Sequence, residues 1–284
     1  MKTVKKSEKG MPEEMKRSLN LKSVANAREL GGYVTLDGKK VKSGLLLRTA
    51  KLNSLSAEDI LRLKTEYNLA HVIDLRNAQE AALLPDPAID GVNFYNIPVF
   101  DDAIMEKFSQ ESLKNAYSDE PEPILIYKMG LQLGLLSDDL YANVLASEFG
   151  RKAFSRFFEV LLASSEDEAV LWHCSGGKDR TGIASVLILS ALGVDEKTAM
   201  DDYLATNVYR AATISALRND LTDKGFDNEV IDGLITLFEG VNESFMQKAF
   251  DYMNGSYGSV INYIKTELGV SDEDIKSLRS KYLE

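Results

Sequence analysis

A short apolar run, a loop with two adjacent glycines and a long apolar run follow one another between residues 169 and 193. The first run, 169–172, has the length of a buried strand, and the second, 181–192, has the length of a buried helix that ends at Gly193. The two glycines allow the backbone between the runs to adopt conformations that other residues avoid. The segment therefore predicts a strand, a tight loop and a helix start in direct succession.

The loop carries the only cysteine of the chain, Cys174, and five residues separate it from Arg180. A curled backbone here turns successive N–H groups toward an anion, and the helix start adds further N–H groups and the positive end of its dipole. The same groups favour a thiolate. The guanidinium of Arg180 can hold two phosphate oxygens at once. We therefore expect phosphate or another oxyanion at the loop residues Ser175, Gly176, Gly177, Lys178, Asp179 and Arg180.

Other uses of a glycine-rich loop fit the spacing less well. A nucleotide-binding loop needs Ser or Thr after the lysine and a glycine five positions before Gly177, where this chain has Asp179 and Trp172. A zinc site needs several ligands, and the chain has one cysteine and two histidines. We therefore expect neither a metal nor a cofactor. For Cys174 the remaining alternative is a buried structural thiol.

The stretch from Cys174 to Thr181 resembles the signature loop of the cysteine-dependent protein tyrosine and dual-specificity phosphatases: a cysteine, five residues, an arginine and then Ser or Thr. The ending at 177–182 is similar to that of the bacterial tyrosine/lipid phosphatases of the atypical type. The resemblance extends over most of the chain from about Leu21, and it is weakest over 102–151. Further stretches with the same likeness are 26–33, 72–80, 257–259 and 268–270.

The resemblance implies a phosphatase that hydrolyses phosphotyrosine, with dual specificity or phosphoinositide hydrolysis as alternatives. Cys174 would attack phosphorus and form a cysteinyl-phosphate intermediate, while the loop N–H groups and Arg180 stabilise the transition state. The substrate would be a phosphorylated protein or a phospholipid. Two other readings stay open: a catalytically silent module that recognises phosphate, and another enzyme with a similar loop, such as a sulfurtransferase or an arsenate reductase.

Two aspartates compete for the role of general acid. In relatives with the Lys-Asp-Arg ending, the acid is the aspartate inside the loop, which corresponds to Asp179. Other members of the superfamily place it on a mobile loop after a strand, which corresponds to Asp101 or its neighbour Asp102. We favour Asp179 and keep Asp101 as the rival.

Other residues have supporting roles by the same resemblance. His173 fixes the loop and helps to keep the thiol ionised, and Thr181 either donates to the sulfur or caps the helix. We expect Asn26, Arg28 and Asp74 to hold the loop from beneath. For Arg48 and Arg76, a surface salt bridge and a substrate contact both stay open.

Strand-like and helix-like stretches alternate along the chain, which predicts an α/β fold: a central, mostly parallel twisted sheet flanked by helices, with a helical insertion and a helical C-terminal region. An Asp-Gly pair at 37–38 predicts a hairpin before the parallel strands. We expect a basic, flexible tail over 1–20 and a single phosphatase domain over 21–284, with the helical insertion at 103–166. Ligands of such sheets bind beyond the carboxyl ends of the strands.

The chain has 33 basic and 44 acidic residues, a net charge of −11. This charge argues against nucleic acid as a partner and against adhesion to an anionic membrane surface. A polyanionic lipid headgroup would need a local basic patch, to which Lys178 could contribute. No stretch is long and apolar enough for an integral membrane segment. A lone unpaired cysteine suits a reducing compartment, so we expect a cytoplasmic protein.

Overall fold

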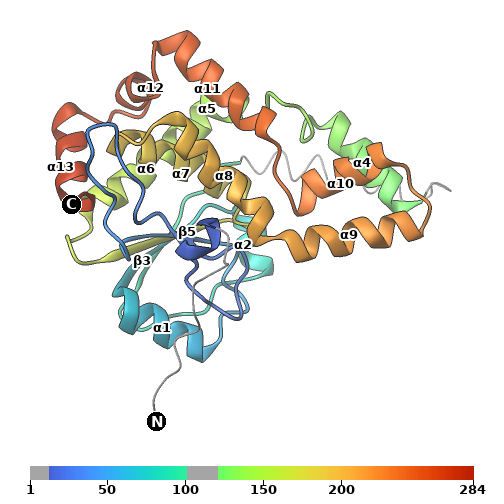
Figure 1. Ribbon diagram of the computed structural model, residues 1–284, viewed down its shortest axis with the longest axis horizontal. Helices are drawn as coiled ribbons and strands as arrows, with labels where there is room; N and C mark the ends of the chain where they lie inside the picture. Colours follow the sequence, from blue (N-terminus) through green and yellow to red (C-terminus); the bar gives the residue numbers. More distant parts are fainter. Residues whose placement is uncertain (1–12, 101–120) are drawn as a thin grey trace.

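The computed structural model describes residues 13–100 and 121–284 (Figure 1). Its five-stranded sheet has the strand order β1-β2-β5-β3-β4. Strand β1 pairs with β2 antiparallel, and all other neighbouring strands are parallel. The predicted α/β class with a mostly parallel sheet is therefore confirmed. The strands are β1 (Arg28–Glu29), β2 (Leu46–Thr49), β3 (Leu69–Asp74), β4 (Asn93–Asn96) and β5 (Ala169–His173).

Helices cover both faces of the sheet. Helix α1 (Ala57–Tyr67) lies on one face, and α6 (Glu148–Ala163) and α7 (Asp179–Leu192) lie on the other (Figure 1). The side chains of β5 alternate between the two apolar clusters: Val170 and Trp172 belong to the cluster that includes α6 and α7, and Leu171 belongs to the cluster on the α1 side. This alternation is the normal consequence of strand geometry. Because all of β5 is buried, its apolar run needs no polar face.

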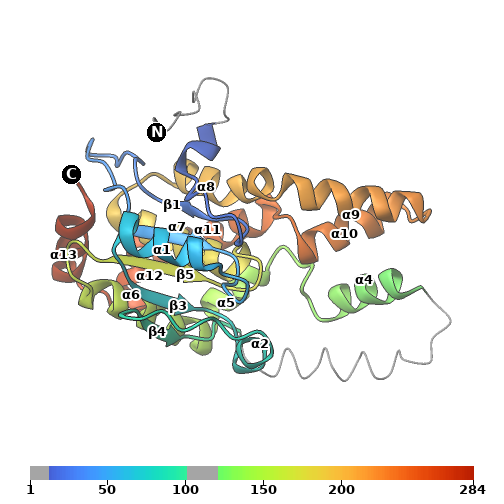
Figure 2. The same ribbon diagram turned by 90° about the horizontal axis from the view of Figure 1, so that it is seen from below.

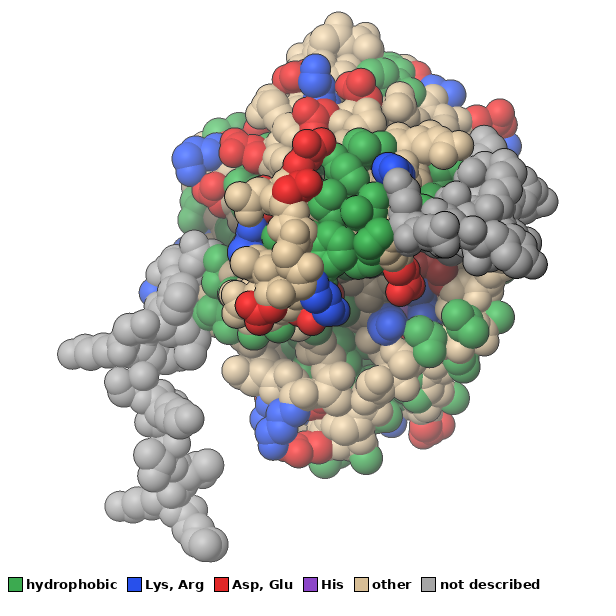
Figure 3. Space-filling model, turned by 90° about the vertical axis from the view of Figure 1, so that its right-hand side faces the viewer, with side chains coloured by type: hydrophobic (Ala, Val, Ile, Leu, Met, Phe, Trp, Pro, Cys, Tyr) green, Lys and Arg blue, Asp and Glu red, His purple; other side chains and the backbone are tan. Residues whose placement is uncertain are grey.

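Helices α4, α9 and α10 form a separate projection at one end of the molecule (Figures 1 and 2). Their apolar side chains make a small cluster of their own, centred on Ile231 and Leu234 of α10. Figure 3 shows apolar side chains gathered on this end of the molecule, with acidic and basic side chains around them. The remaining elements are a 3₁₀ turn (Glu13–Arg17), α2 (Ala78–Leu83), α4 (Glu122–Gln132), α5 (Leu140–Ala146), α8 (Glu196–Tyr209), α9 (Ala211–Asp223), α10 (Asn228–Phe238), α11 (Glu243–Tyr257), α12 (Val260–Glu267) and α13 (Asp272–Tyr282).

Three expectations about the chain before β5 can be compared with the described residues only in part. The tail predicted over 1–20 is packed in its last part, because Leu19 is buried and Arg17 lies over the ring of Tyr33. The Asp-Gly turn is present, but it joins only an isolated bridge between Val34 and Lys40. Of the insertion predicted over 103–166, the structure describes the part from residue 121, and there α6 belongs to the main core.

The register of the sheet brings three strand ends to one place. His173, the last residue of β5, pairs with Thr49 of β2 on one side and with Asp74 of β3 on the other. The segments that follow these strands therefore leave the sheet side by side, and Cys174 comes directly after the central one. Among the described helices, none is long and apolar enough to cross a membrane.

Candidate active site

The loop between β5 and α7 is tightly fitted against the strand next to it. Gly177 has a φ of +65°, and a Cβ atom at this position would lie 2.3 Å from the carbonyl oxygen of Thr49. Both the left-handed conformation and the close backbone approach require glycine here. The neighbouring Gly176 has no such constraint, because a Cβ there would meet only the flexible side chain of Lys178.

Three consecutive carbonyl groups of the loop are held from one side. The Lys51 amide donates to the oxygen of Ser175 over 3.2 Å, and the Arg210 guanidinium donates to that of Gly176 over 3.2 Å. The oxygen of Gly177 accepts from Nδ2 of Asn26 at 2.8 Å and from Nη2 of Arg48 at 2.9 Å. A trans peptide places its N–H opposite its C=O, so the N–H groups of residues 176–178 point to the other side. Successive N–H groups turned in this way can bind an anion.

A buried ion-pair network lies behind these contacts. Asp202 of α8 accepts from Nε of Arg28 at 3.1 Å and from Nη1 of Arg48 at 2.5 Å, and all three side chains are buried. Arg28 also donates to Oδ1 of Asn26. Burial by itself raises the pKa of Asp202, but the two guanidinium groups outweigh it and the pKa is lowered. Burial lowers the pKa of Arg48 to about 10, with the charge of Arg28 as the next cause.

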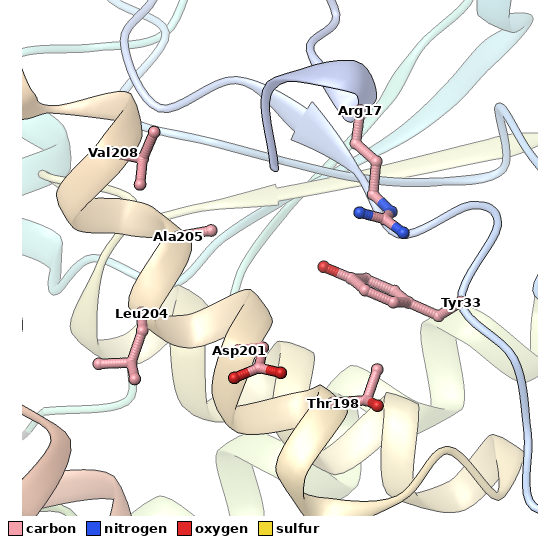
Figure 4. A pocket seen from close by; sticks show the side chains of 7 residues that line it. All are labelled: Arg17, Tyr33, Thr198, Asp201, Leu204, Ala205 and Val208. Atoms are coloured by element: carbon pink, nitrogen blue, oxygen red, sulfur yellow. The ribbon is translucent and has the colours of Figure 1, made fainter. Parts of the chain in front are cut away.

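A cavity of about 460 Å³ lies behind this network, between α8 and the N-terminal segment (Figure 4). Arg17 lies over the ring of Tyr33, with its guanidinium carbon 3.9 Å from the ring centroid. The Tyr33 hydroxyl donates to Oδ1 of Asp202 over 3.2 Å. Tyr33 therefore lines this cavity and also contacts the ion-pair network.

The residue that carries the sulfur is buried and is not exposed at the surface of the loop. Cys174 is 1% exposed and contacts the main core. The hydroxyl of Thr181, the residue after Arg180, is buried and has no hydrogen-bond partner among the described residues. A buried hydroxyl without a partner is unusual, so this group is available to donate to a nearby anion.

The guanidinium of Arg180 is held by a carboxylate from α2. Glu80 accepts from Nη1 of Arg180 at 2.5 Å and from Nη2 at 2.9 Å, and it also accepts from the Ser175 hydroxyl at 2.6 Å. Nε of Arg180 is buried without a partner among the described residues, and the guanidinium lies 4.9 Å from the centroid of the Phe100 ring. The ion pair with Glu80 uses one N–H on each terminal nitrogen of Arg180. The N–H of Nε and the other N–H on each terminal nitrogen can therefore bind a second anion.

Glu80 is ionised in this setting. Burial by itself raises the pKa of Glu80, but Arg180, the Ser175 hydroxyl and the Asn77 amide outweigh it and lower the pKa to about 2. Asn77 and Glu80 also form a capping box at the start of α2, which fixes the helix that carries the carboxylate.

The carboxylate of Asp86 contacts His173, the residue that precedes the cysteine. The His173 ring is fully buried, with Nδ1 at 3.3 Å from the carbonyl oxygen of Cys174 and Nε2 at 2.9 Å from Oδ2 of Asp86. Burial raises the pKa of Asp86, but His173 and Arg76 outweigh it, so the pKa is lowered. Arg76 also binds both carboxylate oxygens of Asp74. Asp74, Asp86 and His173 are close enough to share a cation, but the Arg76 guanidinium already pairs with both carboxylates.

The predicted acid lies at the other end of the loop. Oδ1 of Asp179 accepts from the Tyr141 hydroxyl at 2.5 Å, and the ammonium of Lys178 lies 3.0 Å from Oδ2. Lys178 also donates to the carbonyl oxygen of Thr236 at 2.7 Å. Lys178 is therefore a buried, paired side chain and not a solvated residue at the loop rim.

Of the supporting residues predicted from the sequence, Asn26 and Arg28 lie beneath the loop, and His173 and Thr181 flank it as described above. Asp74 binds Arg76, and within the described part of the chain it makes no hydrogen bond or ion pair with loop residues 174–180. Asp101 lies outside the described residues. The surface salt bridge considered for Arg48 and Arg76 is wrong, because both side chains are buried.

Besides Lys51 and Arg210, which bind loop carbonyls, sequence reasoning missed four residues that the structure brings to the site: Glu80, Asp86, Tyr141 and Asp202. A signal existed for Glu80, because its spacing from Asn77 is that of a capping box, which marks the start of a helix. The other three come from segments whose local pattern gives no sign of a site. Tyr141 and Asp202 lie 38 and 154 residues from the partners that they contact.

Comparison with known proteins gives a consistent result. A family described as the tyrosine phosphatase family matches residues 19–284. A putative tyrosine-protein phosphatase of Cupriavidus necator is 27% identical over 94% of this chain and 89% of its own length. The triple specificity protein phosphatase PtpB of Mycobacterium tuberculosis is 24% identical over 86% of this chain and 92% of its own length.

A tyrosine-protein phosphatase of Nostoc commune is 24% identical over 84% of this chain and 74% of its own length. The family match extends over β1 to the last helix and so includes the loop, its supporting ion pairs and Glu80. Tyrosine phosphatases are hydrolases of phosphoric monoesters, and the chain belongs to the tyrosine phosphatase family.

Proposed function

We propose that this protein hydrolyses phosphotyrosine through a cysteinyl-phosphate intermediate, with Cys174 as nucleophile, Arg180 as phosphate-binding residue and Asp179 as general acid. One observation supports this above the others. The loop carbonyls are bound from outside by Lys51, Arg210, Asn26 and Arg48, which turns the N–H groups of residues 176–178 to the opposite side. A loop held in this way is preorganised for the equatorial oxygens of a phosphoryl group.

In the first step, the thiolate of Cys174 forms a bond to phosphorus while the bond from phosphorus to the leaving oxygen breaks. Asp179 gives its proton to that oxygen and becomes a carboxylate. The loop N–H groups and the free N–H groups of Arg180 bear the charge on the phosphoryl oxygens. The start of α7, where Asp179 and Arg180 lie, adds the positive end of the helix dipole.

In the second step, water attacks phosphorus, Asp179 takes the proton from the water, and the bond between sulfur and phosphorus breaks. Sulfur leaves as a thiolate, which the buried hydroxyl of Thr181 can stabilise by donating a hydrogen bond. Phosphate is released, and Cys174 and Asp179 return to their starting states.

The substitution Cys174→Ser tests the nucleophile. We expect hydrolysis of 4-nitrophenyl phosphate to fall by at least about 10⁴-fold, because a serine hydroxyl without an adjacent base is a weak nucleophile. Binding of inorganic phosphate, measured by calorimetry, should persist. Asp201→Asn, on the exposed side of α8, is the control and should keep full activity. Turnover by Cys174→Ser at the wild-type rate would show that the mechanism is wrong.

Substrate class needs a separate experiment. Because the Lys178 ammonium is buried and donates to the carbonyl oxygen of Thr236, it presents little positive charge to a polyanionic headgroup. We therefore expect phosphotyrosine peptides to have a higher kcat/KM than phosphoserine or phosphothreonine peptides and than phosphoinositides in detergent micelles. A higher kcat/KM for the phosphoinositides would make lipid hydrolysis the main activity.

A further inference from the structure

The Tyr141 hydroxyl contacts the carboxyl group of Asp179. Tyr141 comes from α5, is completely buried, and donates to Oδ1 of Asp179 at 2.5 Å. Burial raises the pKa of Tyr141 well above its usual value, and the charge of Asp179 raises it further, so the hydroxyl stays a neutral donor. A neutral phenol has one proton to donate, and here it goes to a carboxylate oxygen.

The tyrosine is fixed by its surroundings and not by Asp179 alone. Its ring makes edge contacts with Tyr203, at 5.9 Å between centroids, and with Phe245, at 5.6 Å. The Tyr203 hydroxyl lies 3.1 Å from that of Tyr141 and donates to the carbonyl oxygen of Asn242. Aromatic edge contacts of this kind hold rings in defined orientations. The donor is therefore present at the same place whether Asp179 is protonated or ionised.

From this geometry we infer that Tyr141 is a positioning residue: by donating to Oδ1 in both half-reactions, it leaves Oδ2 as the oxygen that gives up and regains the proton. The inference rests on the proposed role of Asp179 as general acid. In the first half-reaction, Oδ2 loses its proton to the leaving oxygen; in the second, Oδ2 takes a proton from the attacking water. Oδ1 accepts from Tyr141 throughout, so the carboxyl group cannot turn and present the wrong oxygen.

Lys178 contacts both oxygens and so cannot make this distinction. Its ammonium lies 3.2 Å from Oδ1 and 3.0 Å from Oδ2 of Asp179. Of the two carboxylate oxygens of Asp179, the Tyr141 hydroxyl is hydrogen-bonded to Oδ1 and not to Oδ2 in the described part of the chain. The difference between the two carboxylate oxygens therefore comes from the tyrosine.

The test is Tyr141→Phe, which removes the hydroxyl and keeps the ring contacts. Its kcat/KM should be compared on phenyl phosphate and on 4-nitrophenyl phosphate, whose leaving group departs readily without a proton. We expect a loss of about 10-fold or more on phenyl phosphate and about 3-fold or less on 4-nitrophenyl phosphate, because only the former depends strongly on general acid catalysis. Inhibition by inorganic phosphate should be unchanged.

Tyr263→Phe is the matched control. Tyr263 is also buried, and its hydroxyl donates to the carbonyl oxygen of Leu145 in the same helix α5, away from Asp179. Any loss of kcat/KM in the Tyr263→Phe variant should be the same on phenyl phosphate and on 4-nitrophenyl phosphate. Adding Tyr141→Phe to Asp179→Asn should cause no further loss beyond Asp179→Asn alone, because the tyrosine acts through the aspartate.

The outcomes separate this inference from the proposed function. A wild-type protein that hydrolyses neither ester refutes both, and so does an Asp179→Asn variant with equal losses on the two esters. If Asp179→Asn shows the leaving-group dependence and Tyr141→Phe does not, only the role of Tyr141 is wrong. Should Tyr141→Phe fail to fold, 4-aminophenylalanine at position 141 keeps a donor. The kcat/KM on phenyl phosphate relative to that on 4-nitrophenyl phosphate is then compared with the wild-type ratio. An unchanged ratio supports the inference, and a lower ratio overturns it.

Discussion

The Glu80 carboxylate binds both terminal nitrogens of Arg180, at 2.5 and 2.9 Å, across 100 residues of sequence. The same carboxylate accepts from the Ser175 hydroxyl, so it contacts both ends of the loop between Cys174 and Arg180. Without it, the guanidinium would be a buried cation with a flexible stem. Glu80 therefore fixes the direction of the guanidinium that we propose binds a phosphoryl group through two N–H bonds.

Glu80→Gln should lower kcat/KM for 4-nitrophenyl phosphate by about 10- to 100-fold, because the guanidinium loses the charged partner that sets its position. Glutamine keeps the size of the side chain and one acceptor oxygen, so large packing changes are not expected. Steady-state kinetics on the purified variant measure the effect. Glu58→Gln is the control, since Glu58 makes only an exposed ion pair with Lys22; equal kinetics of the two variants would contradict this role of Glu80.

The stability of the protein should depend on pH through Glu80. Its pKa is lowered from 4.5 to about 2 in the folded protein, so folding favours the ionised form. The contribution, about 3 kcal/mol at most, is fully present above pH ~4.5 and is lost as the pH falls toward ~2. The difference in unfolding free energy between wild type and Glu80→Gln, measured by urea denaturation, should therefore shrink from pH 6 to pH 3. A difference that stays constant over this range would be inconsistent with the assignment.

Asp202→Asn should destabilise the protein by about 3–5 kcal/mol, because it leaves Arg28 and Arg48 buried without a counter-charge. Activity should fall as well, since Arg48 and, through Asn26, Arg28 hold the Gly177 carbonyl. Chemical denaturation and kinetics measure the two effects. Asp201→Asn, one position away, removes only an exposed pair with Lys197 and should change stability by about 0–1 kcal/mol. Similar stability losses in the two variants would rule out a special role for the buried network.

Gly177→Ala should disrupt the loop more than an ordinary glycine substitution. Gly177 combines a positive φ with a Cβ position 2.3 Å from the Thr49 oxygen, so either the loop or β2 must move. We expect kcat/KM to fall by about 100-fold or more. Gly32→Ala is the comparison: Gly32 also has a positive φ, +83°, but its Cβ position is open, so only the backbone strain of about 1 kcal/mol remains. Gly177→Ala with wild-type kinetics would show that the close approach is not needed.

The elements that were predicted correctly depend on short stretches of sequence. The apolar run before Cys174, the glycines and the apolar run after Arg180 form β5, the loop and α7 as expected. Their side chains are neighbours in the chain, so strand and helix periodicity determine them directly. The Asp-Gly hairpin shows the limit of such local signals. The turn formed, but it joins only an isolated bridge, and β2 pairs with β1 and β5 inside the sheet.

The sequence alone determined the strand, the glycine-containing loop, the helix and the spacing of Cys174 and Arg180, since all of these lie within one continuous stretch, 169–192. Only the tertiary structure decided what holds that loop: Glu80 on Arg180, Asp202 beneath Arg48, and Tyr141 on Asp179. Each of these contacts joins distant segments, and its existence depends on how the sheet and helices pack. Burial then turns these contacts into strong ones, because a buried charge or hydroxyl that loses its partner is costly.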